Sequence, residues 1–210
     1  MRTGAVKPAM PLWFRLVYSA FVAMLVPVYA THYPLTNFLW FSNLALLGGL
    51  VGAWTGAAAV TSMLLVAVGL VEMGWIADFL GGLILGGRPP FGMVGYMFDP
   101  GIPLAVRGLS LYHLLLPIAL FWMVWRFGYD EHAWRRLIPI GWAVIIVTRL
   151  VVAPEDNVNF ALHPPWLDAG IEGGLGWLWA AGVMAVAAFV WWLTHRLVSA
   201  LLRACDRHPR

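Results

Sequence analysis

Residues 57–78 read AAAVTSMLLVAVGLVEMGWIAD, an apolar stretch whose ionisable side chains are Glu72 and the terminal Asp78. An α-helix needs about 20 apolar residues to cross the hydrocarbon layer of a bilayer. A stretch of this length is longer than a strand or the core helix of a soluble domain requires. The segment therefore predicts a transmembrane helix with one carboxylate inside it.

Five more apolar segments surround this one, near residues 11–30, 37–54, 108–127, 134–153 and 175–200. The chain is 61% hydrophobic and 11% charged, whereas soluble domains are about 45–50% apolar and 25% charged. We predict an all-α fold in which residues 1–210 form a single transmembrane domain, a polytopic bundle of six transmembrane helices. The stretch 79–95 starts apolar and then turns to Gly-Gly-Arg-Pro-Pro, which indicates an interfacial or re-entrant segment.

The basic side chains predict the orientation, because Lys and Arg are enriched in cytoplasmic loops. With the N-terminus inside, three basic residues face outward, namely Arg88, Arg107 and Arg149. The others fall on the cytoplasmic side: Arg2, Lys7, Arg15, Arg126, Arg135, Arg136, Arg196, Arg203, Arg207 and Arg210. The last outer loop carries acids, including Asp168. We therefore predict a multi-pass protein of the bacterial inner (cytoplasmic) membrane, with both termini in the cytoplasm.

A signal peptide is the alternative interpretation of the first segment, since Val28-Tyr29-Ala30 resembles a cleavage site after an apolar run. We expect the helix to be retained, because its positively charged lead-in is long and Trp13, Phe14 and Arg15 are typical of an interface anchor.

This topology places most intramembrane polar residues in one leaflet, the outer one. They are Thr36, Asn37, Asn43, Glu72, His113 and Arg149, and Asn157 and Asn159 follow just outside the fifth helix. A charged side chain at the bilayer centre costs about 2.5–3.5 kcal/mol on insertion scales, so Glu72 and Arg149 are expected to face the bundle interior. Arg149 is the candidate partner of Glu72 or of an acid in the last loop.

The remaining polar side chains are not expected to form a site. We expect Asp78 and Asp99 to be solvated loop residues, and the inner half of the bundle to hold only isolated Ser and Thr. Each outer residue taken singly can be an interhelical hydrogen-bond partner. Their concentration in one leaflet indicates a functional site, because unrelated structural residues have no reason to share it.

Three short motifs carry a resemblance. Tyr33 to Asn43 (YPLTNFLWFSN), His113-Leu114-Leu115-Leu116-Pro117 and Asn157-Val158-Asn159-Phe160 resemble the corresponding stretches of a six-helix membrane superfamily. It includes the androgen-induced lipid hydrolases and the YwaF-type bacterial membrane proteins, and the chain also looks like a set of uncharacterised bacterial membrane proteins. The resemblance implies hydrolysis of fatty-acid esters, with Thr36 as nucleophile and His113 as its partner.

The first functional hypothesis is accordingly a membrane lipid (acyl-ester) hydrolase or acyltransferase. His113 would take the proton of the Thr36 hydroxyl, Asn43 or Asn159 would donate to the oxyanion, and Glu72 would orient His113. The second hypothesis is a non-catalytic protein: a transporter-like subunit, a lipid- or ligand-binding protein, or an assembly subunit.

A third hypothesis is a metal site made of His32, His113, His163 and Glu72, but their spacing matches no ligand motif. We therefore predict no metal and no cofactor. Retinal needs an intramembrane lysine, whereas Lys7 is the single Lys, and covalent haem needs Cys-x-x-Cys-His. The expected partners are membrane lipids and a hydrophobic or acyl ligand. Nucleic acid is not expected, and oligomers or partner subunits stay open.

Overall fold

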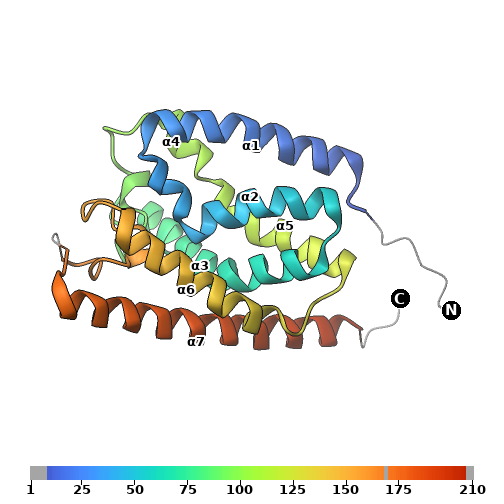
Figure 1. Ribbon diagram of the computed structural model, residues 1–210. Helices are drawn as coiled ribbons and strands as arrows, with labels where there is room; N and C mark the ends of the chain where they lie inside the picture. Colours follow the sequence, from blue (N-terminus) through green and yellow to red (C-terminus); the bar gives the residue numbers. More distant parts are fainter. Residues whose placement is uncertain (1–8, 168–169, 207–210) are drawn as a thin grey trace.

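The computed structural model describes residues 9–167 and 170–206, and every regular element within them is helical (Figure 1). The α-helices are α1 (Leu12–His32), α2 (Phe41–Thr55), α3 (Ala58–Ile84), α4 (Leu104–Leu109), α5 (Tyr112–Phe127), α6 (Ala133–Val151) and α7 (Gly173–Asp206). Three short 3-10 helices join them: η1 (Leu35–Leu39), η2 (Gly95–Met97) and η3 (Val158–Phe160). The predicted all-α fold is confirmed. Arg2, Lys7, Asp168, Arg207 and Arg210 lie outside the described residues.

Four helical stretches in this part of the chain are long and apolar enough to cross a membrane. They are Leu12–His32, Ala58–Ile84, Leu104–Phe127 and Gly173–Cys205. α2 is a shorter apolar helix, and α6 carries Arg135, Arg136 and Arg149 within its length. Many large apolar side chains remain exposed on the helix surfaces. This pattern is compatible with a membrane protein, because lipid would cover those side chains.

Helix α3 is central to the bundle and packs against α2, α5, α6 and α7 (Figure 1). Trp191 of α7 is buried and donates its indole N–H to the carbonyl of Ala67 on α3, at 3.2 Å. Gly141 of α6 leaves room for that indole, because a Cβ at this position would collide with the ring. A glycine and a tryptophan thus fix where α6, α3 and α7 meet.

The end of α3 differs from the sequence expectation. The helix runs six residues past Asp78, to Ile84, because the apolar stretch that follows Asp78 continues the helical pattern. The next loop folds back onto it, and the carboxylate of Asp78 accepts the backbone N–H groups of Phe91 (2.6 Å) and Val94 (3.1 Å). Asp78 is fully buried, so its expected role as a solvated loop residue was wrong.

Two other predicted segments are interrupted in the structure. Residues 35–39 form η1, and α2 begins only at Phe41. The fourth segment begins with the short α4 and continues as α5 after Ser110 and Leu111. The 3-10 helix η1 packs against α2, α6 and η3, and α4 packs against α1. Asn37 and Ser110, which belong to the two interruptions, line the cavity described below.

Candidate functional site

The centre of the site is a buried acid–histidine pair between α3 and α5. His113 Nδ1 lies 2.7 Å from Glu72 Oε2, and Glu72 is 1% exposed. The other carboxylate oxygen of Glu72, Oε1, is buried and has no hydrogen-bond partner. Buried polar atoms are nearly always hydrogen-bonded. This oxygen therefore marks a place where the protein alone leaves a polar group unsatisfied.

Aromatic rings hold the imidazole in place. Trp75, one turn after Glu72 on α3, stacks on His113 with ring centroids 4.6 Å apart, and Tyr112 stacks at 4.1 Å. Tyr112 also donates its hydroxyl to Asn43 Oδ1 at 2.9 Å, and Asn43 Nδ2 donates to the carbonyl of Asn37 at 2.8 Å. With Nδ1 engaged by Glu72, the Nε2 atom of His113 is left for a ligand.

Glu72 and His113 line a cavity of about 870 Å³, within the range of roughly 300–1,000 Å³ that is typical of small-molecule sites. Its wall combines the end of α1, η1, the start of α2, α3, α5, α7 and the loop before α7. Most of the wall is apolar. The polar or aromatic side chains on it include Tyr29, Tyr33, Asn37, Trp40, Ser42, Asn43, Trp75, Tyr96, Ser110, Tyr112, Asn159, Trp179 and Trp191.

The cavity is open beside α7. Helices α3 and α7 are in contact where Trp191 meets Ala67. Val71, one turn farther along α3, and Val186 of α7 both line the cavity. Val71 is 45% exposed and Val186 is 63% exposed. Both side chains therefore lie at the surface of the bundle as well as on the cavity wall, so the cavity reaches that surface between α3 and α7. An apolar molecule could enter through an opening of this kind from the side of the bundle.

One of the two residues that the resemblance pairs lines the cavity. His113 lines the cavity, but Thr36 does not, although its neighbour Asn37 does. The role of Thr36 as nucleophile stays a prediction, and Ser42 is a hydroxyl residue that does share the cavity wall with His113.

Arg149 is not the partner of Glu72. Its guanidinium donates to the carbonyls of Ala161 (3.1 Å) and Ile171 (2.9 Å) and lies over the ring of Trp177. Of the two expected partners of Arg149, Glu72 was therefore wrong, and no ion pair joins Arg149 to a last-loop acid within the described residues, which do not include Asp168. Arg149 lies at the end of α6, where carbonyls of the following loop are within reach, whereas Glu72 meets His113 across the α3–α5 contact.

The two asparagines of the last loop organise backbone. Asn157 has a φ of 35° and accepts the N–H groups of Leu162 and His163. Asn159 accepts the N–H of Phe41 at 3.1 Å and donates to the carbonyl of Leu39 at 2.8 Å. Asn159 thereby ties the loop to the start of α2. The amide groups of Asn43 and Asn159, the two expected oxyanion donors, both already donate to carbonyls.

The three histidines of the metal hypothesis belong to different networks. His32 contacts the carbonyl of Val28, His163 contacts the carbonyls of Pro154 and Pro164, and His113 contacts Glu72. Within residues 9–167 and 170–206, no group of three His, Cys, Asp or Glu side chains could hold a metal ion.

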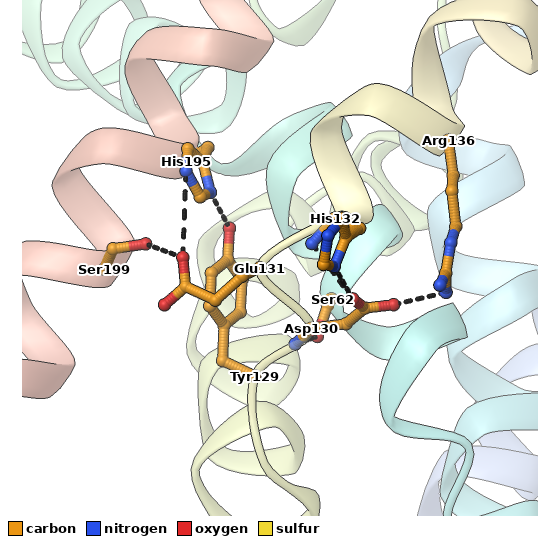
Figure 2. Close-up of polar contacts among 8 residues, drawn as sticks. All are labelled: Ser62, Tyr129, Asp130, Glu131, His132, Arg136, His195 and Ser199. Carbon is orange, nitrogen blue, oxygen red and sulfur yellow. Dashed lines mark hydrogen bonds and ion pairs between the residues drawn. The ribbon is translucent and has the colours of Figure 1, made fainter.

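A second polar cluster lies at the opposite end of the bundle, where Figure 2 shows the α5–α6 loop facing α7 and α3. His195 Nδ1 lies 2.8 Å from the Tyr129 hydroxyl, and Glu131 Oε2 is 3.9 Å from His195 Nε2 and 3.4 Å from the Ser199 hydroxyl. The backbone N–H of Asp130 donates to Ser62, and its carboxylate pairs with Arg136. The expectation that this end holds only isolated Ser and Thr was wrong.

Several residues of the site were missed from the sequence, among them Trp75, Tyr112 and Ser110. Trp75 could have been found, because it lies three residues after Glu72 and so on the same helix face. Tyr29 and Ser110 share a 2.6 Å hydrogen bond between their hydroxyls. They are far apart in the chain, and no sequence signal connects them.

Comparison with protein-family models gives no match, and neither a curated protein nor a solved structure matches the chain.

Proposed function

We propose that this protein binds an amphiphile inside the membrane, with the apolar chain in the cavity and the polar head at the Glu72–His113 pair. The observation that supports this most strongly is the unpaired Oε1 atom of Glu72, at 1% exposure, on the wall of an otherwise largely apolar cavity of about 870 Å³. The apolar wall suits the chain of such a molecule, and the polar pair would fix the orientation of its head. The opening at Val71 and Val186 supports entry from the bilayer.

Binding can be tested with a photoreactive hexadecanol that carries a diazirine in its chain. We expect saturable labelling of α7 residues that line the cavity, such as Val183 and Val186, with competition by unlabelled hexadecanol. Val183→Trp fills the cavity and should abolish the saturable part. Phe189→Trp is the matched control, because Phe189 is exposed on the same helix and does not line the cavity. Labelling that does not saturate and is equal in both variants would contradict the proposal.

We also propose that the chain is a six-helix, multi-pass protein of the bacterial inner membrane with both termini in the cytoplasm. The distribution of Lys and Arg supports this orientation. The free thiol of Cys205 is exposed near the C-terminus and offers a test. A membrane-impermeant maleimide should label it in inverted vesicles and not in intact cells. Glu155→Cys in a Cys205→Ser background should give the reverse pattern, and the same pattern for both would contradict the topology.

A second candidate function is hydrolysis of an acyl ester, as in the lipid hydrolases that the motifs resemble. It is favoured by the 2.7 Å contact between Glu72 and His113 Nδ1, because a carboxylate that orients an imidazole leaves Nε2 ready to act as a general base. The base would act on water or on the Ser42 hydroxyl, and acyl transfer would follow the same course with another acceptor.

A chromogenic long-chain ester tests this activity. Turnover by the wild-type protein should be lost in His113→Gln and retained in Thr36→Ala, since Thr36 does not line the cavity. Loss of turnover in Thr36→Ala would instead support the role that the resemblance implies. No turnover by the wild-type protein would leave binding as the function.

A further inference from the structure

The charged side chains on the cavity wall are of one sign. Glu72, Glu155 and Asp156 line the cavity, and no Arg or Lys in the described part of the chain does so. The carboxylates of Glu155, which is exposed, and Asp156 are therefore uncompensated on the wall.

Arg149 and Arg107 keep their positive charge but are bound away from the cavity wall. Arg149 is engaged by two loop carbonyls and the Trp177 ring, and Arg107 donates to the carbonyl of Met97 at 3.0 Å. Neither residue lines the cavity. An anionic head group would meet carboxylates without a cation to pair with, at a cost that is large in a low-dielectric setting.

Hydrogen bonding at the unsatisfied oxygen of Glu72 also favours a head group that carries a proton donor. Oε1 is an acceptor, so only a donor can satisfy it. No described side chain or backbone group donates a hydrogen bond to Oε1. A donor from a ligand, or a water, would complete the site.

The aromatic rings on the cavity wall also favour a cationic head group. Tyr33, Trp40, Trp75 and Trp179 line the cavity, and the faces of such rings attract cations. Burial raises the pKa of Tyr96 to about 12, so this hydroxyl stays neutral at physiological pH.

Resting on the proposed function, we propose that the bound amphiphile carries a primary ammonium head group, and that the site selects it over a carboxylate. The ammonium donates to Glu72 Oε1 and lies among the aromatic rings, while Glu155 and Asp156 draw cations toward the cavity. Free alkylamines and amine-bearing lipids share this chemistry.

The test measures displacement of the photoreactive hexadecanol in nanodiscs of phosphatidylcholine. The three competitors are hexadecylammonium, hexadecanol and hexadecanoate, which share one chain length and differ in head group. We expect hexadecylammonium to compete about tenfold better than hexadecanol, and hexadecanoate to compete least. In a second arm, phosphatidylethanolamine replaces part of the phosphatidylcholine. Loss of probe labelling in that arm would identify a lipid amine as the source.

Glu72→Gln should remove the preference for hexadecylammonium over hexadecanol, because a neutral amide does not attract an ammonium more strongly than a hydroxyl. Glu131→Gln is the matched control, because Glu131 lies in the other polar cluster and does not line this cavity. Should Glu72→Gln fail to fold, Glu155→Gln with Asp156→Asn replaces it, and about a threefold loss of ammonium competition is expected.

The outcomes separate the two proposals. Equal or better competition by hexadecanoate, or an equal loss for all three competitors in Glu72→Gln, would overturn the ammonium inference and leave amphiphile binding intact. Failure of the probe itself to label the wild-type cavity would overturn both.

Discussion

The bundle contains the same residue pair twice, a glutamate facing a histidine, in two different environments. Glu72 and His113 are 2.7 Å apart with side chains 2% and 11% exposed, whereas Glu131 and His195 are 3.9 Å apart and the Glu131 side chain is 62% exposed. An exposed pair contributes about 0–1 kcal/mol. A buried pair pays a desolvation cost that its attraction often fails to recover. A small contribution to folding stability is therefore enough to account for the Glu131 pair. It does not account for the burial of the Glu72 pair.

The two glutamates also differ in how well they are satisfied. Glu131 is open to solvent and has Ser199 as a further neighbour, while Glu72 keeps one oxygen without any partner. Water can satisfy the first carboxylate, but protein alone does not satisfy the second. The comparison shows that residue type does not distinguish the two pairs, whereas burial and an unsatisfied oxygen on a cavity wall do.

Removal of one histidine from each pair gives the largest expected contrast. His113→Ala leaves the buried Glu72 without a partner and should lower the free energy of unfolding by about 3–5 kcal/mol. His195→Ala should lower it by at most about 1 kcal/mol. Both can be measured by chemical unfolding in detergent micelles. Equal losses in the two variants would break the distinction between the pairs.

A third carboxylate shows the case of a buried acid whose two oxygens are both hydrogen-bonded. Asp78 is buried like Glu72, but both of its oxygens accept backbone N–H groups. Asp78→Ala orphans the N–H groups of Phe91 and Val94, and each is expected to cost about 1–3 kcal/mol. Limited proteolysis should then cleave the 86–103 loop faster, with Asp99→Ala as a control in the same loop. An unchanged cleavage rate would show that Asp78 does not hold the loop.

Tyr112→Phe tests the hydrogen bond between Tyr112 and Asn43 beside the buried pair. The variant keeps the ring that stacks on His113 and removes the hydroxyl that donates to Asn43. We expect a loss of about 0.5–1.5 kcal/mol in the free energy of unfolding. Tyr129→Phe removes a hydroxyl at the other end and is the comparison. A loss above the range would mean that the Asn43 contact organises more of the cavity than one hydrogen bond.

The smallest effect is expected at the exposed carboxylate. Glu131→Gln keeps the shape of the side chain and removes its charge, so the free energy of unfolding should change by less than about 1 kcal/mol. The change should shrink further at high salt, because exposed charges are screened. A larger, salt-independent loss would place Glu131 in the same class as Glu72.

Part of the site could be predicted from the sequence. Glu72 and His113 stood out because ionisable residues inside apolar helices are rare, and the expected inward orientation of Glu72 agrees with its burial. The sequence left the partner of Glu72 open between Arg149 and His113, the residue that the hydrolase hypothesis expected Glu72 to orient. Residue number gives the depth of a side chain along a helix, but it does not give the rotation of the helix or its neighbours. The sequence therefore could not decide between Arg149 and His113.

The sequence by itself determined that the chain forms long apolar helices, because helix length and side-chain polarity are local properties of consecutive residues. Only the tertiary structure decided which polar groups meet: Glu72 with His113, Asp78 with the returning loop, and Glu131 with His195. Those contacts join residues far apart in the chain. They depend on how side chains such as Trp191 against Gly141 set the packing of whole helices.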